Sequence, residues 1–242
     1  MAFPIQPRRV YTQPVDEWAE ACADAEIERM RLARAFYTLQ ADARLEIARA
    51  LMAEPDIYAP ELAACSLRPI LVFDTETTGL SKNDVVIQLG FVCMLPDGTL
   101  LDMGEQVWRT DVKCNPMALK VHQIDSHAVA NGHDPQLALS EFMNLARRVK
   151  RAGGVLVAHN AAFDKRMLQQ TADHEGIFFD LGLVFCTANA LKNVSPSYRG
   201  QTCKNADVYA FLGGEDMNMH QALNDAKATA FIYLRGTELG WW

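Results

Sequence analysis

The architecture of this chain follows from one stretch, Ile70-Leu71-Val72-Phe73-Asp74-Thr75-Glu76-Thr77-Thr78-Gly79-Leu80. Its four apolar residues after Pro69 predict a buried strand. If the strand continues, Asp74 and Glu76 leave the same face of it, because residues two apart in a strand share a face. Adjacent carboxylates repel each other, and hard divalent ions such as magnesium take oxygen ligands of this kind. The alternative at this point is a strand that simply meets a polar turn.

The composition of the 242 residues fits one substantial globular core, or a core domain with an appendage. No apolar run approaches the roughly 20 residues of a membrane span, so we expect no membrane protein. The six cysteines form no C-x-x-C pair, which favours reduced thiols in the cytoplasm or another reducing intracellular compartment. The formal charge of -7 argues against a broad basic face for duplex DNA, but not against a nucleic-acid enzyme with an acidic, metal-binding site.

The N-terminal part of the chain is predicted to be a helical extension, residues 1–65, ahead of a domain at residues 66–242. Residues 15–54 contain neither Gly nor Pro, and two apolar series at helical spacing indicate two helices. We expect this extension to pack on its own domain or on a second copy of the chain, rather than to form a dedicated docking module.

Four more strands are predicted after the opening one. Residues 85–95 and 100–109 indicate a β-hairpin around the turn at residues 96–99. Residues 155–158 predict a short buried strand, and another is expected near the end of residues 178–187.

Helices are predicted between and after these strands. Residues 115–131 indicate short helices in which His122 and Asp125 are exposed, and a longer helix begins at Asp134-Pro135. The other predicted helices are residues 160–173, 202–212 and 222–234. This order of elements predicts an α/β fold with a mixed sheet and helices on both faces.

Two further acids lie where helices are expected to begin. In His159-Asn160-Ala161-Ala162-Phe163-Asp164 a strand meets a helix, so Asp164 falls in the first helical turn, aimed at the strand ends. His220 precedes a predicted helix that contains Asp225, so a mobile imidazole and a fixed carboxylate can converge. Taken alone, Asp164 is more often a structural acid, because the helix dipole favours an acid in the first turn. His159 and Asn160 could likewise be satisfied polar residues at a strand end, and a single histidine before a helix is usually inert.

Together these pieces resemble the DEDD superfamily of 3′-to-5′ exonucleases, in its histidine-bearing, DnaQ-like (DEDDh) branch. The resemblance covers about residues 69–239 and rests on the three stretches at residues 73–80, 159–164 and 220–225. The branch is specified by His220, because Gln221 stands where the other branch has tyrosine. The chain departs from the family pattern at Gln123, where glycine is usual, and at Cys186, where aspartate is usual.

The resemblance implies an RNase H-like fold, a mixed five-stranded sheet flanked by helices. It also implies two Mg²⁺ or Mn²⁺ ions, with the ligands Asp74, Glu76, Asp164 and Asp225. His220 is then the general base for hydrolysis at the 3′ end of single-stranded DNA or RNA, which releases nucleoside 5′-monophosphates. The implied substrate-binding residues are Thr77, Thr78, Gly79, Leu80, His122, Asn160 and Phe163.

Two other functions are open at this point. The same fold can serve as a catalytically silent nucleic-acid or protein interaction module, although the intact acids argue against it. A metal-dependent hydrolase of small phosphate esters needs the same metals. The sequence also leaves open the choice between DNA and RNA, the choice among proofreading, repair and RNA processing, and a polymerase or homodimer contact through the N-terminal helices.

Overall fold

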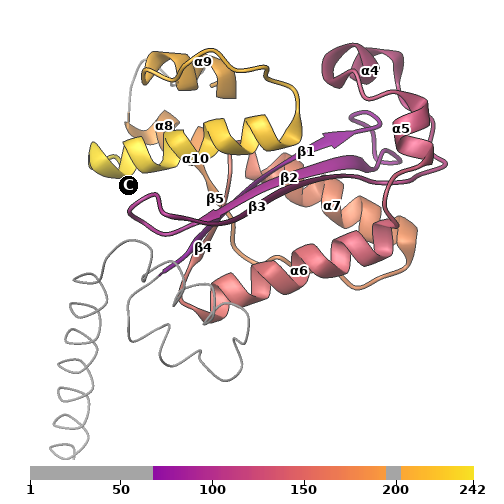
Figure 1. Cartoon of the computed structure of the whole chain (residues 1–242), viewed down its shortest axis with the longest axis horizontal. Helices are drawn as coiled ribbons and strands as arrows, with labels where there is room; N and C mark the ends of the chain where they lie inside the picture. Colours follow the sequence, from indigo (N-terminus) through magenta and orange to yellow (C-terminus); the bar gives the residue numbers. More distant parts are fainter. Residues whose placement is uncertain (1–67, 195–202) are drawn as a thin grey trace, which may run out of the picture.

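The computed structural model describes residues 68–194 and 203–242 (Figure 1). The predicted helical extension at residues 1–65, and with it the predicted domain boundary, lies outside the described residues. In the described part, a five-stranded sheet carries helices on both faces, as predicted. No helix in these two segments combines the length and apolar character that a bilayer crossing requires.

The sheet is mixed, as the order of elements indicated. Its strands are β1 (Ile70–Thr77), β2 (Val86–Met94), β3 (Leu100–Val107), β4 (Val155–Ala158) and β5 (Phe185–Cys186). They lie in the order β3-β2-β1-β4-β5. The β3–β2 and β2–β1 pairs are antiparallel, whereas the β1–β4 and β4–β5 pairs are parallel. The predicted hairpin is confirmed, and β1 continues through both of its acids.

Helices cover the two faces of the sheet unequally. They are α4 (Pro116–His122), α5 (Ser126–Ala130), α6 (Pro135–Arg151), α7 (Ala161–Glu175), α8 (Thr187–Val194), α9 (Asn205–Phe211) and α10 (Ala222–Glu238). Figure 1 shows α10 across one face and α6 and α7 across the other.

The alternation of side chains along β1 assigns each residue to one of these layers. Ile70 and Val72 pack with Ala226 of α10, whereas Leu71 and Phe73 join the core under α6 and α7. Because alternate residues of a strand share a face, Asp74 and Glu76 lie on the α10 side and Thr75 lies on the α7 side. The polar end of β1 therefore faces α10 on one side of the sheet and α7 on the other.

The prediction that His122 is exposed is wrong. Only 5% of this residue is exposed, because α4 ends there and the ring turns inward. The Ile124 N–H donates to Nδ1 of His122 at 3.0 Å, and the Cys114 Sγ lies 3.5 Å from Nε2. Gln123, where the family has glycine, keeps the left-handed backbone that glycine favours, with a φ of 57°. Asp125 is exposed as predicted and caps α5 by accepting the Ala128 N–H.

Candidate active site

Three acidic side chains from two layers of the fold meet at the polar end of β1. Asp74 and Glu76 of β1 and Asp225 of α10 each offer a carboxylate oxygen, and these oxygens lie within 4.8 Å of one another. All three groups are buried or half-buried. Close oxygen donors with this much negative charge suit a hard divalent cation. We call Asp74, Glu76 and Asp225 the acidic cluster.

The electrostatics of the acidic cluster show how crowded it is. Burial raises the pKa of Asp74 well above its ordinary value, and the carboxylates of Asp164, Asp225 and Glu76 raise it further. Burial, followed by repulsion from Asp225 and Asp164, raises the pKa of Glu76 to about 8. Without a cation, protons must therefore neutralise part of this charge near neutral pH. A bound divalent ion can replace those protons.

Hydrogen bonds from α9 and from the residues just before α10 hold Asp225 in place. The backbone N–H of His220 donates to Oδ2 of Asp225 at 2.6 Å, and the Asn205 side-chain amide donates to Oδ1 at 3.3 Å. His220 lies just before α10, as predicted, and adopts a φ of 66°, a region that residues other than glycine rarely occupy. Its imidazole is exposed. The predicted convergence of His220 and Asp225 thus occurs through the backbone, with the ring free to reach a substrate.

Asp164 lies beside the acidic cluster but is held from the opposite layer. It is 2% exposed in the first turn of α7, where the sequence predicted it. Its Oδ1 accepts the Thr75 N–H at 3.1 Å and the Thr75 hydroxyl at 2.8 Å. Burial raises the pKa of Asp164 to about 7, even though the hydrogen bonds from Thr75 lower it. The mutually close ligand oxygens found in the described residues do not include one from Asp164.

A cavity of about 880 Å³ opens directly beside the acidic cluster. The predicted substrate-binding residues on its lining are Thr77, Gly79, Leu80, His122 and Phe163. The opposite wall comes from α4 and the loop before it, with the side chains Lys113, Cys114, Met117 and Val121. Of α4, the sequence predicted only His122 as a substrate-binding residue, so the other side chains of this wall were missed.

Two predicted substrate-binding residues are placed differently. Thr78 is fully buried in the loop that joins β1 to β2. Its hydroxyl donates to Oδ1 of Asp84 at 2.8 Å and accepts the Val85 N–H at 3.1 Å. Asn160 is exposed at the start of α7 and forms no side-chain cap bond there. Neither residue lies on the lining of the cavity.

His159 is a satisfied polar residue at a strand end, which was the structural alternative for this position. Its ring is buried, with Nδ1 2.9 Å from the Thr187 hydroxyl and Nε2 2.7 Å from the Cys203 carbonyl oxygen. Two other residues that support the acids, Thr75 and Asn205, were also missed. Strand alternation could have pointed to Thr75, whereas nothing in the local sequence connects Asn205 with Asp225.

Comparison with known proteins identifies the family of this chain. A family model described as Exonuclease, of the RNase T type, matches residues 71–233. The chain belongs to this exonuclease family. The resemblance to exonucleases drawn from its motifs is confirmed. Exonucleases of this type use divalent metals, and the acidic cluster is the candidate metal site of this chain.

The curated relatives include two bacterial polymerases. The PolC-type DNA polymerase III of Caldanaerobacter subterraneus subsp. tengcongensis is 30% identical over 170 residues, covering 69% of this chain and 11% of that protein. The corresponding protein of Staphylococcus saprophyticus subsp. saprophyticus is 26% identical over 182 residues, covering 75% of this chain and 12% of that protein. The chain thus spans about a tenth of the length of the curated relatives it matches.

Solved structures share the fold at low sequence identity. A 3′-exonuclease that recognises the 3′ end of histone mRNA stem-loop has a TM-score of 0.63 at 18% identity, covering 72% of this chain and 83% of that one. Exonuclease X in complex with 5′ overhanging duplex DNA has a TM-score of 0.53 at 21% identity, covering 72% of this chain and 94% of that one.

Proposed function

We propose that this chain is a metal-dependent 3′-to-5′ exonuclease that shortens single-stranded DNA or RNA and releases nucleoside 5′-monophosphates. The proposal depends on the acidic cluster, which lies next to a cavity large enough for a nucleotide. Three carboxylates gathered out of water destabilise a fold unless a cation accompanies them. A module that only binds other macromolecules gains nothing from such a cluster, whereas a phosphodiester hydrolase requires it.

The proposal distinguishes acidic residues that bind metal from the residues that orient them. Asp74, Glu76 and Asp225 would hold two Mg²⁺ or Mn²⁺ ions, with Asp164 as the fourth acidic residue. When bound, such ions supply Lewis-acid activation of water and stabilise the departing oxygen. Thr75 orients the Asp164 carboxylate through two hydrogen bonds to Oδ1. Asn205 and the His220 N–H do the same for Asp225.

His220 is the proposed general base. Its backbone is anchored to Asp225 while its ring is exposed, so the imidazole can turn toward the scissile phosphate. The ring takes a proton from the attacking water, the new P–O bond forms, and the bond from phosphorus to the 3′ oxygen of the penultimate nucleotide breaks. Each step consumes one water, leaves a new 3′ hydroxyl and releases one nucleoside 5′-monophosphate. Proton transfer of this kind contributes about 10²–10⁴ in rate.

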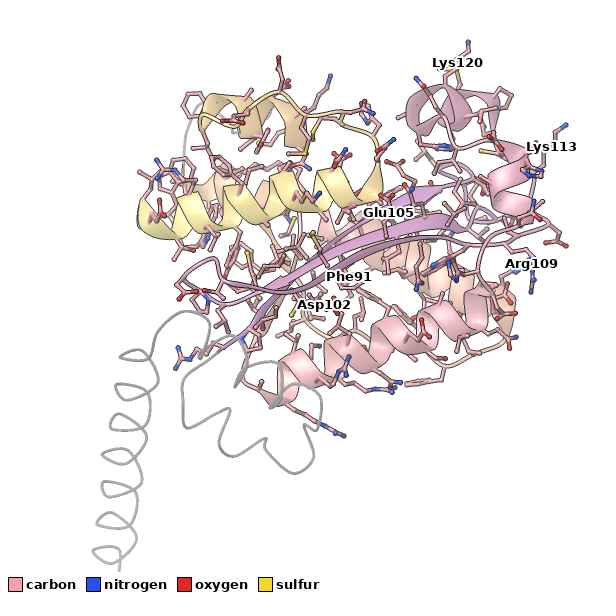
Figure 2. All side chains as sticks on the ribbon, in the orientation of Figure 1. Phe91, Asp102, Glu105, Arg109, Lys113 and Lys120 are labelled. Carbon is pink, nitrogen blue, oxygen red and sulfur yellow. The ribbon has the colours of Figure 1, made fainter. Side chains whose placement is uncertain are left out.

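The cavity explains the choice of a strand end. Leu80 is 76% exposed, Met117 68% and Val121 48%, so an apolar wall stands open to solvent beside the acids. An unpaired base can insert against such side chains, whereas a stacked base pair cannot. Burial lowers the pKa of His122, which keeps that ring neutral against the sugar or base. Lys113 and Lys120 extend outward at the same end of the molecule, where they can meet upstream phosphates (Figure 2).

The similarity to a segment of PolC-type polymerases favours a place in DNA replication or repair. A polymerase or a second copy of the chain is the proposed partner of residues 1–65. The reduced thiols expected from the sequence fit a cytoplasmic or other reducing intracellular location.

The test uses single-stranded DNA and RNA of one sequence, labelled at the 5′ end or at the 3′ end, with Mn²⁺. We expect the 5′ label to give a ladder that shortens from the 3′ end and the 3′ label to be released at once as a mononucleotide. Asp74→Asn should be inactive, whereas Asp102→Asn, on the exposed edge of β3, should cut like the parent. Shortening from the 5′ end, or binding without cleavage, would overturn the proposal. Turnover of p-nitrophenyl phosphate alone would favour the hydrolase of small esters.

A further inference from the structure

The helix that carries Asp225 is capped by the sheet rather than by its own residues. The first N–H groups of any helix have no partner within it, and a side chain just before the helix usually accepts them. Gln221, at the cap position of α10, makes no such bond. Oε1 of Gln88 accepts the Ala222 N–H at 3.1 Å instead, and Oε1 of Glu105 accepts the Leu223 N–H at 2.9 Å.

The strand register places these two acceptors level with the acids. Glu76 of β1 pairs with Gln88 of β2, and Asp74 pairs with Gly90, which in turn pairs with Glu105 of β3. The acids and the acceptors thus occupy two adjacent rows that run across three strands. Glu105 lies on the part of β3 that faces the start of α10 (Figure 2).

Gly90 lets the helix come this close. A Cβ at this position would lie 2.1 Å from the Leu223 backbone nitrogen and 2.2 Å from the Ala222 carbonyl carbon. Both contacts are with backbone atoms, so no side-chain rotation could relieve them. The start of α10 therefore rests directly on β2, and the Gln88 side chain, only 5% exposed, is enclosed at that contact.

We propose that Gln88 and Glu105 are positioning residues for the acidic cluster. By accepting the first two N–H groups of α10, they fix the helix on the sheet so that Asp225, three residues beyond Ala222, stays within reach of Asp74 and Glu76. This inference rests on the proposed function, because it assigns the two residues a part in metal binding. Groups that orient metal ligands commonly change metal affinity or activity by about 10–100-fold when they are replaced.

The test measures Mn²⁺ binding to the full chain by calorimetry without nucleic acid, and then kcat and KM for a single strand. Gln88→Met removes the acceptor at nearly constant volume, and we expect its Mn²⁺ dissociation constant to rise about tenfold. Its kcat at subsaturating Mn²⁺ should fall in parallel, with KM for the strand within about twofold. Glu105→Met should weaken Mn²⁺ binding, whereas Glu105→Gln, which keeps an acceptor oxygen, should stay within about threefold of the parent in 0.15 M salt.

Gln106→Met is the matched control. Gln106 is the next residue of β3 and faces α6, where its amide lies 3.5 Å from Glu141 Oε2. It should bind Mn²⁺ like the parent. If Gln88→Met does not fold, the comparison of Glu105→Met with Glu105→Gln decides the matter.

The outcomes separate this inference from the proposed function. Equal Mn²⁺ affinity in all variants, or an equal loss in Gln106→Met, overturns the positioning role alone. A parent protein that binds Mn²⁺ but cuts no strand overturns the proposed function, while the metal affinities still report on positioning. A parent protein that binds no Mn²⁺ overturns both.

Discussion

The two sides of the candidate site are built from different kinds of structure. Asp74 and Glu76 lie within an eight-residue strand, and Asp225 lies in a 17-residue helix that rests on the sheet. The facing wall of the cavity comes from α4, a seven-residue helix whose Met117 and Val121 are exposed. Groups that perform chemistry need fixed distances, whereas groups that select a substrate can vary on a loop or a short helix. We call the β1 and α10 part of the site the rigid side and the α4 part the variable side. Replacements on the two sides should have different kinetic effects.

Asp74→Asn should have the largest effect, because it removes a ligand from the rigid side. We expect kcat/KM to fall more than about a thousandfold, the equivalent of several kcal/mol of lost charge stabilisation. The metal-free variant should melt no lower than the metal-free parent at pH 8, because the change relieves repulsion among buried anions. Scanning calorimetry in EDTA checks this, and a variant that melts far below the parent contradicts it.

The metal-free parent should lose stability as the pH rises from about 4 to about 8. Unfolded carboxyls release their protons near pH 4, whereas burial and neighbouring acids raise the pKa of Glu76 to about 8 and burial raises that of Asp164 to about 7. The unfolded state therefore binds fewer protons in this window, and the free energy of unfolding falls by several kcal/mol as the pH rises.

Urea denaturation in EDTA at pH 5 and pH 8 measures this loss. Glu76→Gln should show a smaller loss than the parent, and Mn²⁺ should restore most of the stability at pH 8. A free energy of unfolding that increases over this window, with no response to Mn²⁺, would show that the acids are not crowded in solution.

Replacement of His220 tests whether its exposed ring takes part in the chemical step, as the acids of the rigid side do. We expect His220→Asn to lower kcat about a hundredfold through loss of the base. Asparagine tolerates the positive φ of this position, so its melting temperature should stay near that of the parent. Unchanged turnover in His220→Asn would remove the imidazole from the mechanism.

Val121→Ser addresses the variable side. The loss of apolar contact with the terminal nucleotide should raise KM about fivefold and leave kcat within about twofold. Leu137→Ser is the control, since Leu137 is 61% exposed on α6, away from the cavity lining. Steady-state kinetics on a single strand distinguishes them, and a loss in kcat alone would place Val121 with the chemical groups.

Gln123→Gly should have the smallest effect, and it should be stabilising. Glycine adopts the left-handed backbone at the end of α4 without strain, so we expect a gain of about 0.5–1 kcal/mol. Gln169→Gly, inside α7, should instead lose about 1 kcal/mol. Chemical denaturation measures both changes, and a loss in Gln123→Gly would mean that the Gln123 side chain supports α4.

The sequence predicted the rigid side of the site better than the variable side. Apolar runs and period-two alternation located the strands, and the acids of β1, α7 and α10 follow motifs whose local geometry is fixed by a strand end or a first helical turn. The prediction from polarity that His122 is exposed was wrong, because the burial of this residue depends on how α4 folds over the cavity and not on residue type. The contacts of Gln88 and Glu105 with α10 span 134 and 118 residues, and no local pattern records them.

The most direct test of the acidic cluster is diffraction from crystals soaked in Mn²⁺, recorded where manganese scatters anomalously. We expect anomalous peaks in contact with carboxylate oxygens of Asp74, Glu76 and Asp225, and no such peaks in crystals of Asp74→Asn. Peaks only at other acids, or equal peaks at this position in Asp74→Asn crystals, would contradict it.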